Sequence, residues 1–147
     1  MELHLKDIVS YSGTAYLVEG LVSYRVGRRK RVLARLVDGE RVLWMEPLVG
    51  ELDERVLFLE EVRDLDMTTP PPANILYKGR TYLRVLAGQA LVETSGQTPG
   101  RVSGTCEVWR YRAAGDTFIQ IEAWPDGQVV LAGPSADHGM LQILPAK

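Results

Sequence analysis

Two glutamates stand at matching places in two similar stretches of this sequence, and a pair of carboxylates can do chemistry if the fold brings them together. Glu46 ends the stretch 39–46, and Glu122 ends the stretch 115–122, which aligns with it. Two close carboxylates would share a proton or bind a divalent cation. Repeats preserve structure more often than catalysis, so the stronger expectation is that each glutamate faces water or pairs with an arginine.

The residues before these glutamates alternate in character, as the residues of strands do. One face of each stretch is apolar, which predicts a core face shared by Leu43, Met45, Ile119 and Ile121. The opposite face mixes aromatic and polar groups, so it would form either the seam between the two stretches or an exposed patch for a partner. That face carries Val42, Trp44 and Glu46 in one stretch, and Phe118, Gln120 and Glu122 in the other.

The strongest charge run lies at positions 25–31, where five of the seven residues are Arg or Lys. The commonest structure for such a run is a solvated hairpin tip, and the alternatives are contacts with an acidic protein, a lipid surface or nucleic-acid phosphates. Aromatic and arginine side chains are enriched in protein interfaces, so the surface predicted to contact a partner combines both kinds. Its candidate residues are Tyr24, Arg28, Arg29, Arg31 and Trp44.

Catalytic signatures are weak throughout the chain. Cys106 and His138 could form a nucleophile and its base, but Cys106 starts a predicted strand, where a buried structural thiol is more usual. A metal site formed by His4 and His138 lacks a third ligand at suitable spacing. There is no phosphate-binding loop, nucleophile elbow or dinucleotide fingerprint. The sequence therefore predicts a non-enzymatic protein with no catalytic residue, metal or cofactor.

The elements that position these residues come in two copies. The spacing Tyr-x-Gly-x-x-Tyr-Leu occurs at 11–17 and again at 77–83, in the same order as the stretches that end in the glutamates. We predict a first β repeat at 1–67, a stiff proline-rich connector at 68–73, and a second β repeat at 74–147. The second copy has a longer loop at 94–104, rich in turn formers, which we expect to be exposed and mobile.

Each copy has the pattern of several short strands joined by tight turns. Gly13 and the pair Asp38-Gly39 stand between apolar runs, which indicates hairpins. The predicted fold class is therefore all-β, as two repeated small SH3-like barrel units related by pseudo-twofold symmetry. The alternative is one β-sandwich or barrel formed from both repeats.

The chain also resembles the bacterial family catalogued as domain of unknown function 4178. The residues that carry the resemblance are Asp7-Ile8-Val9-x-Tyr11-x-Gly13-x-x-Tyr16-x-Val18-x-Gly20, Trp44-x-Glu46 and Ile121-Glu122-x-Trp124-x-Asp126-Gly127. The resemblance spans nearly the whole chain and implies an internally duplicated all-β protein with no established activity. Because the family's genes are often found near membrane-stress and polyamine-related genes, it also implies an accessory role.

Composition limits the class of protein and its partners. The chain is 46% hydrophobic and 24% charged, as globular proteins are, and its net charge of −2 does not favour general binding to nucleic acid or anionic membranes. The single cysteine excludes an intrachain disulfide, and the composition of the first residues and of the apolar runs leads us to expect neither a signal peptide nor a transmembrane segment. We therefore expect a cytoplasmic protein.

These observations predict a binding or scaffold module in an accessory or stress-related bacterial system, with another protein as its partner. One alternative is a small-ligand or metal binding protein, or a minor enzyme, that uses the seam around Glu46 and Glu122. A second is nucleic-acid binding through the basic run at 25–31. Peripheral membrane association and the oligomeric state stay open.

Overall fold

The computed structural model describes residues 2–48, 55–65 and 67–146. Within them the chain forms one sheet of eleven strands, and every pairing is antiparallel. A short 3-10 turn, His138–Met140, precedes the last strand. The strands are β1 (Ile8–Tyr11), β2 (Thr14–Val26), β3 (Arg29–Asp38), β4 (Arg41–Pro47), β5 (Arg55–Glu61), β6 (Asn74–Tyr77), β7 (Arg80–Gly96), β8 (Gly104–Ala113), β9 (Thr117–Trp124), β10 (Gly127–Asp137) and β11 (Leu141–Leu144).

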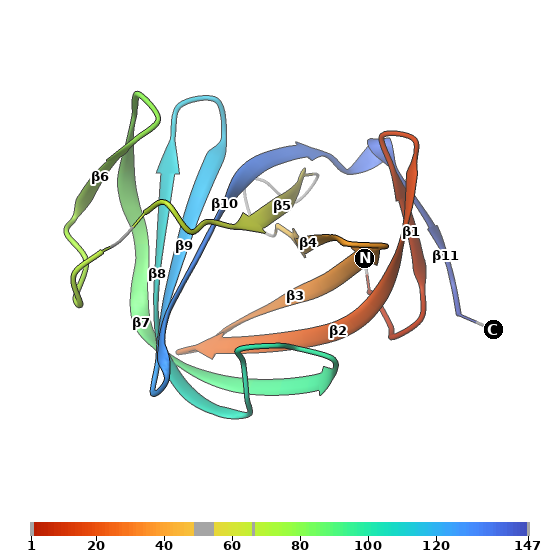
Figure 1. Ribbon diagram of the computed structural model, residues 1–147, viewed down its shortest axis with the longest axis horizontal. Coiled ribbons are helices and arrows are strands. Elements are labelled where there is room, and N and C mark those ends of the chain that lie inside the picture. Colours follow the sequence, from red (N-terminus) through yellow and green to blue (C-terminus); the bar gives the residue numbers. More distant parts are fainter. Residues whose placement is uncertain (1, 49–54, 66, 147) are drawn as a thin grey trace.

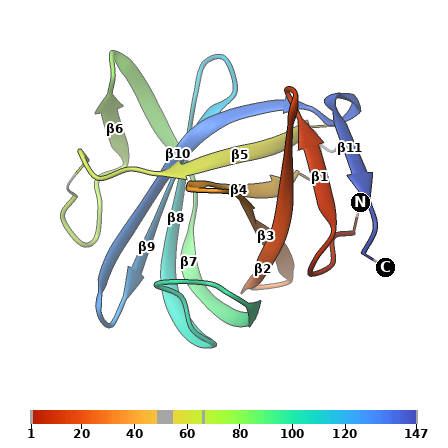
Figure 2. The same cartoon turned by 45° about the vertical axis from the view of Figure 1, so that its right-hand side comes forward.

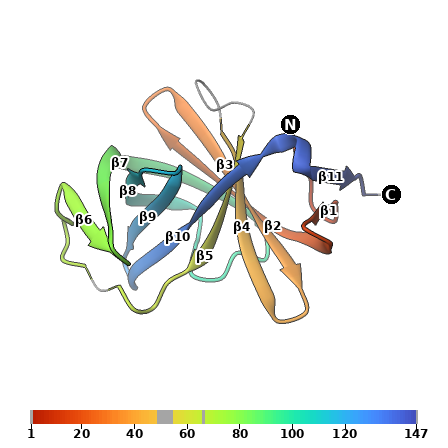
Figure 3. The same cartoon turned by 90° about the horizontal axis from the view of Figure 1, so that it is seen from above.

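Eight of these strands close into a barrel. The order in the sheet is β11-β1-β2-β3-β4-β5-β10-β9-β8-β7-β6, and β2 also pairs with β7, which joins the two ends of the eight-strand run. The strands left outside the barrel lie at opposite ends of the molecule, with β6 at one end and β1 and β11 at the other (Figures 1 and 2). Seen from above, both chain termini lie at the β1–β11 end (Figure 3).

Each half of the chain contributes the same sequence of strands to this arrangement. The strands β2–β5 come from the first half and β7–β10 from the second, and the halves meet at the β2–β7 and β5–β10 pairings. Of the architectures that the sequence allowed, the structure has one closed barrel built from both halves, and not two separate barrels. The segment 68–73 lies between β5 and β6 and contains no strand.

The repeated Tyr-x-Gly motif forms the same turn in both halves. Ser12 and Gly13 connect β1 to β2 with φ values of 52° and 80°, and Lys78 and Gly79 connect β6 to β7 with values of 49° and 77°. Two consecutive residues with positive φ make a type I′ turn, whose twist matches that of the flanking strands. The predicted hairpin at Gly13 is therefore confirmed, and its counterpart at Gly79 is equivalent to it.

Both faces of the central strands are buried, in different cores. One cluster fills the barrel interior and includes Trp44, Leu57, Phe118 and Leu131. A second cluster, with Leu43 and Met45, packs under β1 and β11, and a third, with Ile119 and Ile121, packs under β6. The core face predicted from Leu43, Met45, Ile119 and Ile121 is thus confirmed, and the opposite face also proves to be largely core.

Candidate functional site

A network of polar side chains lies inside the barrel, where apolar residues would be the ordinary filling. We call it the interior network, and its members come from β2, β3, β4, β8, β9 and the loop between β7 and β8. Most of them are almost fully buried, so each charge must be paired to be tolerated there. The members are Tyr24, Arg31, Glu46, Arg101, Arg110, Gln120, Glu122 and Trp124.

Glu46 forms one end of the interior network with two arginines. Arg110 binds its carboxylate with both terminal nitrogens, Nη1 to Oε2 at 2.8 Å and Nη2 to Oε1 at 2.6 Å. Arg31 Nη1 also donates to Oε2, at 3.1 Å. Burial by itself raises the pKa of Glu46, but the two guanidinium groups outweigh it and hold the pKa below its ordinary value. Glu46 is therefore ionised at neutral pH.

Glu122 forms the other end and accepts four hydrogen-bond donors or cations. Tyr24 Oη donates to Oε2 at 3.0 Å, Gln120 Nε2 to the same oxygen at 2.8 Å, and Trp124 Nε1 to Oε1 at 2.9 Å. Arg101 Nε lies 3.3 Å from Oε1. These contacts satisfy the carboxylate without any solvent exposure of the side chain.

The two glutamates are linked through other residues. Arg110 Nε donates to Gln120 Oε1 at 3.1 Å, and Gln120 in turn donates to Glu122, so the chain of contacts runs from one carboxylate to the other. Each glutamate pairs with an arginine, which is one of the two arrangements that the sequence analysis expected for it. Among the described residues, no group of three or more His, Cys, Asp or Glu side chains is arranged to hold a metal ion.

Arg101 and Arg110 are members of the interior network that sequence reasoning missed, and Arg101 is the less expected of the two. It stands in the loop 97–103, within the segment expected to be exposed, yet its side chain is only 4% exposed. Its guanidinium carbon lies 4.1 Å from the ring centre of Trp44, and its Nε donates to Tyr24 Oη at 3.1 Å. An arginine among glycine, proline and serine residues carries no sequence signal for burial.

The predicted partner surface is wrong in its aromatic part. Tyr24 and Trp44 are 3% and 4% exposed and face the barrel interior. Tyr24 belongs to the buried face of β2, whose other face is half-buried or exposed, whereas Trp44 lies in the part of β4 that is buried on both faces. Arg31 is half-buried and bound to Glu46. Of the five candidate residues, Arg28 and Arg29 alone are exposed, at the turn between β2 and β3. Their neighbours Arg25 and Lys30, which were not candidates, are exposed as well.

Cys106 lies within the barrel interior, close to the charge of Glu122. Burial, followed by that charge, raises the pKa of its thiol to about 12. A thiolate is the reactive form, so we expect Cys106 in the native protein to resist Ellman's reagent at pH 8 and to react fully once the protein is unfolded in denaturant. Rapid labelling of the native protein would contradict the burial of this thiol, and a Cys106→Ala variant supplies the background rate.

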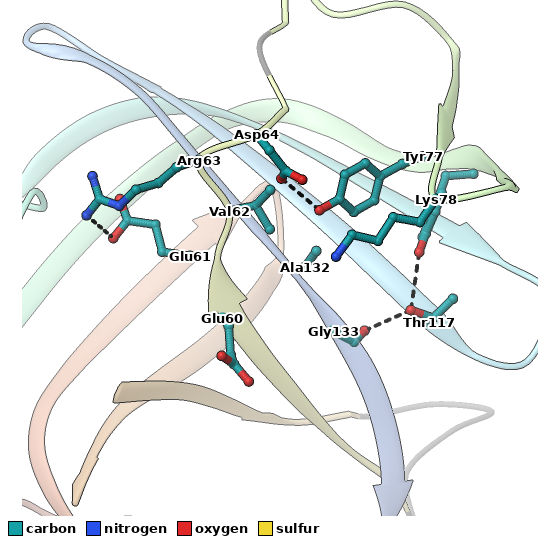
Figure 4. A pocket seen from close by; sticks show the side chains of 11 residues that line it. Glu60, Glu61, Val62, Arg63, Asp64, Tyr77, Lys78, Thr117, Ala132 and Gly133 are labelled. Carbon is teal, nitrogen blue, oxygen red and sulfur yellow. Dashed lines mark hydrogen bonds and ion pairs between the residues drawn. The ribbon is translucent and has the colours of Figure 1, made fainter. Parts of the chain in front are cut away.

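An open groove of about 620 Å³ lies between the end of β5 and the β6–β7 hairpin (Figure 4). Tyr77 Oη donates to Asp64 at 2.9 Å, Lys78 Nζ lies 5.3 Å from the Tyr77 ring centre, and Glu61 pairs with Arg63 at 3.6 Å. Three of its charged groups are thus in an ion pair or accept a hydrogen bond, and Glu60 pairs with Arg41 at 3.6 Å, so the groove offers little unmatched charge to a ligand.

The fold and the interior network define a class of protein: a closed antiparallel β-barrel with a paired charge network in its core. The model of the family described as domain of unknown function (DUF4178) matches residues 4–137. The chain belongs to this family, as its motifs suggested. Neither the curated proteins nor the solved structures include a match.

Among the described residues, no helix has the length and apolar character needed to cross a membrane.

Proposed function

We propose that the protein is a non-catalytic binding module that holds an acidic partner protein on the β2–β3 hairpin. The observation that carries this proposal is the group of exposed cations at the hairpin turn, set in a chain whose net charge is −2. A local excess of positive charge on an acidic protein favours an acidic partner by steering and by complementarity. The cations are Arg25, Arg28, Arg29 and Lys30.

The base of this hairpin is fixed to the barrel, which favours recognition by a preorganised surface. Arg31 at the start of β3 is bound to Glu46, and Tyr24 near the end of β2 is bound to Glu122. The tip is thus held by buried contacts on both of its strands while its cations stay in water. The hairpin backbone therefore needs little further ordering when a partner binds, and this reduces the entropic cost of association.

Two further parts of the proposal concern origin and setting. The equivalent type I′ turns, the matched strand order and the separate outer clusters of the two halves support duplication of one five-strand unit. We place the protein in the cytoplasm, in an accessory or stress-related system.

Nucleic acid is the competing partner for the same cations, because phosphates also bind arginine.

The test is a comparison of proteins crosslinked and captured from the native host by the wild type and by an Arg28→Glu/Arg29→Glu variant. An Arg63→Glu/Lys78→Glu variant changes the net charge equally but lies at the groove of Figure 4, so it is the matched control. We expect an acidic protein captured by the wild type and the control and lost with the hairpin variant.

Nuclease treatment separates the two kinds of partner. Capture that disappears with nuclease, and binding to oligonucleotides that weakens steeply with salt, would replace the protein partner by nucleic acid. Equal capture by all three baits would remove the hairpin from the binding surface. Circular dichroism of each bait excludes misfolding as the cause of a loss.

A further inference from the structure

The guanidinium of Arg101 sits in a box of barrel side chains that has the chemistry of a cation receptor. We call it the guanidinium box, and it consists of Tyr24, Trp44 and Glu122, which contact Arg101, together with Trp124, which donates a hydrogen bond to Glu122. Trp44 supplies an aromatic face, Glu122 the opposite charge, and Tyr24 an oxygen that accepts from Arg101 Nε. Aromatic faces combined with a desolvated carboxylate bind organic cations in proteins.

The box itself belongs to the rigid part of the molecule. Its four residues lie on the barrel strands β2, β4 and β9, and all are at most 8% exposed. Trp124 Nε1 and Gln120 Nε2 donate to the Glu122 carboxylate and fix its orientation independently of Arg101. The receptor side of the contact is therefore built without help from the loop that fills it.

The loop that carries Arg101 is attached far more lightly. Gln97, Pro99, Gly100, Val102 and Ser103 are exposed. Outside the side chain of Arg101, two hydrogen bonds join the loop to the barrel backbone, from Gln97 N to Glu19 O at 2.8 Å and from Thr94 N to Ser103 Oγ at 3.2 Å. Glycines with positive φ stand at positions 96, 100 and 104, so the backbone has freedom at both ends and in the middle. Arg101 is the one buried residue among residues 97–103, all of which the structure describes.

The fit of Arg101 in the box is incomplete. Its Nη1 turns back to the carbonyl of Pro99 in its own loop, at 3.3 Å, and its Nη2 is buried without a hydrogen-bond partner among the described residues. A buried unpaired donor is unfavourable, and such atoms are rare in native proteins. An occupant that arrives without the constraint of the loop could satisfy the same box better.

We propose that the guanidinium box is a binding site for a guanidinium group of a ligand, and that Arg101 fills it in cis until the ligand displaces it. The ligand must be cationic, because the loss of Arg101 leaves Glu122 without a cation in contact. A planar guanidinium matches the site, since it stacks on Trp44 while its edge reaches Glu122 and Tyr24. This site is separate from the β2–β3 hairpin turn and does not depend on the partner proposed there.

Displacement in cis has a quantitative consequence. The apparent dissociation constant equals the intrinsic one divided by the fraction of molecules whose box is vacant. If the loop is open in about 1–10% of molecules, removal of the Arg101 side chain should tighten binding about 10- to 100-fold. The ligand should also release the loop, which exposes its amides to solvent.

The experiment titrates ethylguanidinium into the wild type, Arg101→Ala and Arg28→Ala, with tryptophan fluorescence as the binding signal and hydrogen exchange of residues 96–104 as the signal for the loop. Ethylammonium at equal concentration controls for charge alone. The probe is used at millimolar concentration, below the molar range in which guanidinium salts unfold proteins. N-acetyl-arginine amide then replaces ethylguanidinium, to distinguish a small ligand from an arginine side chain of a protein.

The proposal expects saturable binding of ethylguanidinium to the wild type and to Arg28→Ala, faster exchange of the loop amides on binding, and tighter binding by Arg101→Ala. If the wild type neither binds nor releases its loop, the proposal is overturned, even if Arg101→Ala binds, because Arg101 is then a permanent plug. Equal affinity for ethylammonium would overturn the assignment to a guanidinium. The wild-type measurements decide the outcome if Arg101→Ala does not fold.

Discussion

Replacement of Arg110 by methionine should lower the free energy of unfolding at pH 7 by about 3–5 kcal/mol, because it leaves the buried charge of Glu46 with one remaining arginine. Arg110 is 2% exposed and supplies both of the shortest contacts to that carboxylate, and it also donates to Gln120. Such a loss is a large part of the total stability of a domain. Urea unfolding followed by fluorescence measures it.

The pH dependence of this loss has a definite sign. In the wild type the pKa of Glu46 is depressed, so its contribution is fully present above the ordinary glutamate pKa and is lost as the pH falls through the depressed value. In Arg110→Met, only Arg31 remains to oppose the effect of burial, so the pKa of Glu46 is higher than in the wild type. The difference in stability between the two proteins should therefore shrink as the pH falls from 7 towards about 4.

Two further variants make the test specific. Arg31→Met removes the other arginine, whose side chain is 19% exposed, and should cost about 1 kcal/mol. The double variant Glu46→Leu/Arg110→Met removes both buried charges and should be less destabilised than Arg110→Met alone. If the double variant lost as much stability as Glu46→Leu and Arg110→Met lose together when measured separately, Glu46 and Arg110 would not be coupled.

Replacement of Gly133 by alanine should cost about 3 kcal/mol or prevent folding, because an added methyl group would overlap the carbonyl oxygen of Phe58. Gly133 stands on β10 where it crosses β5, one of the two places at which the halves of the chain join. The obstacle is backbone, which cannot rotate away as a side chain can. Soluble yield and urea unfolding measure the effect.

Gly88→Ala is the matched control, on a strand and with a φ outside the positive region. A methyl group there would meet only Cγ1 of Val26, at 2.8 Å, and the end of a side chain can shift. We expect a loss below about 1 kcal/mol. Similar losses for the two variants would mean that the close approach of β10 to β5 is not a constraint on the fold.

The sequence predicted the local structure of this protein better than its closure. Type I′ turns follow from neighbouring residues, so the repeated Tyr-x-Gly motif was sufficient to place them. The aligned residues Glu46 and Glu122 lie on β4 and β9, at the two ends of the interior network. The pairing of β2 with β7 depends on the registry of distant strands, which no short pattern specifies.

The candidate surface failed for a specific physical reason. Trp44 lies on a strand whose two faces are both covered, so alternation could not tell an exposed face from a buried one there. Tyr24 lies on β2, which alternates between a buried and a more exposed face, and it belongs to the buried one. Arg101 was missed because a turn-rich loop is normally solvated. Its burial is a property of tertiary packing, and a single sequence contains no pattern for it.

The closure of the barrel also bears on how the chain reaches its native state. The β2–β7 pairing joins residues as distant in sequence as Gly20 and Gly96, and β1 pairs with β11 near the other end of the chain. Contacts of such long range require the entropy of large loops to be lost before they add stability, and folding slows as they increase. The meander of each half can form from neighbouring strands alone. The slow step is then the docking of two preformed sheets, and until it occurs the arginines and glutamates of the interior network remain in water.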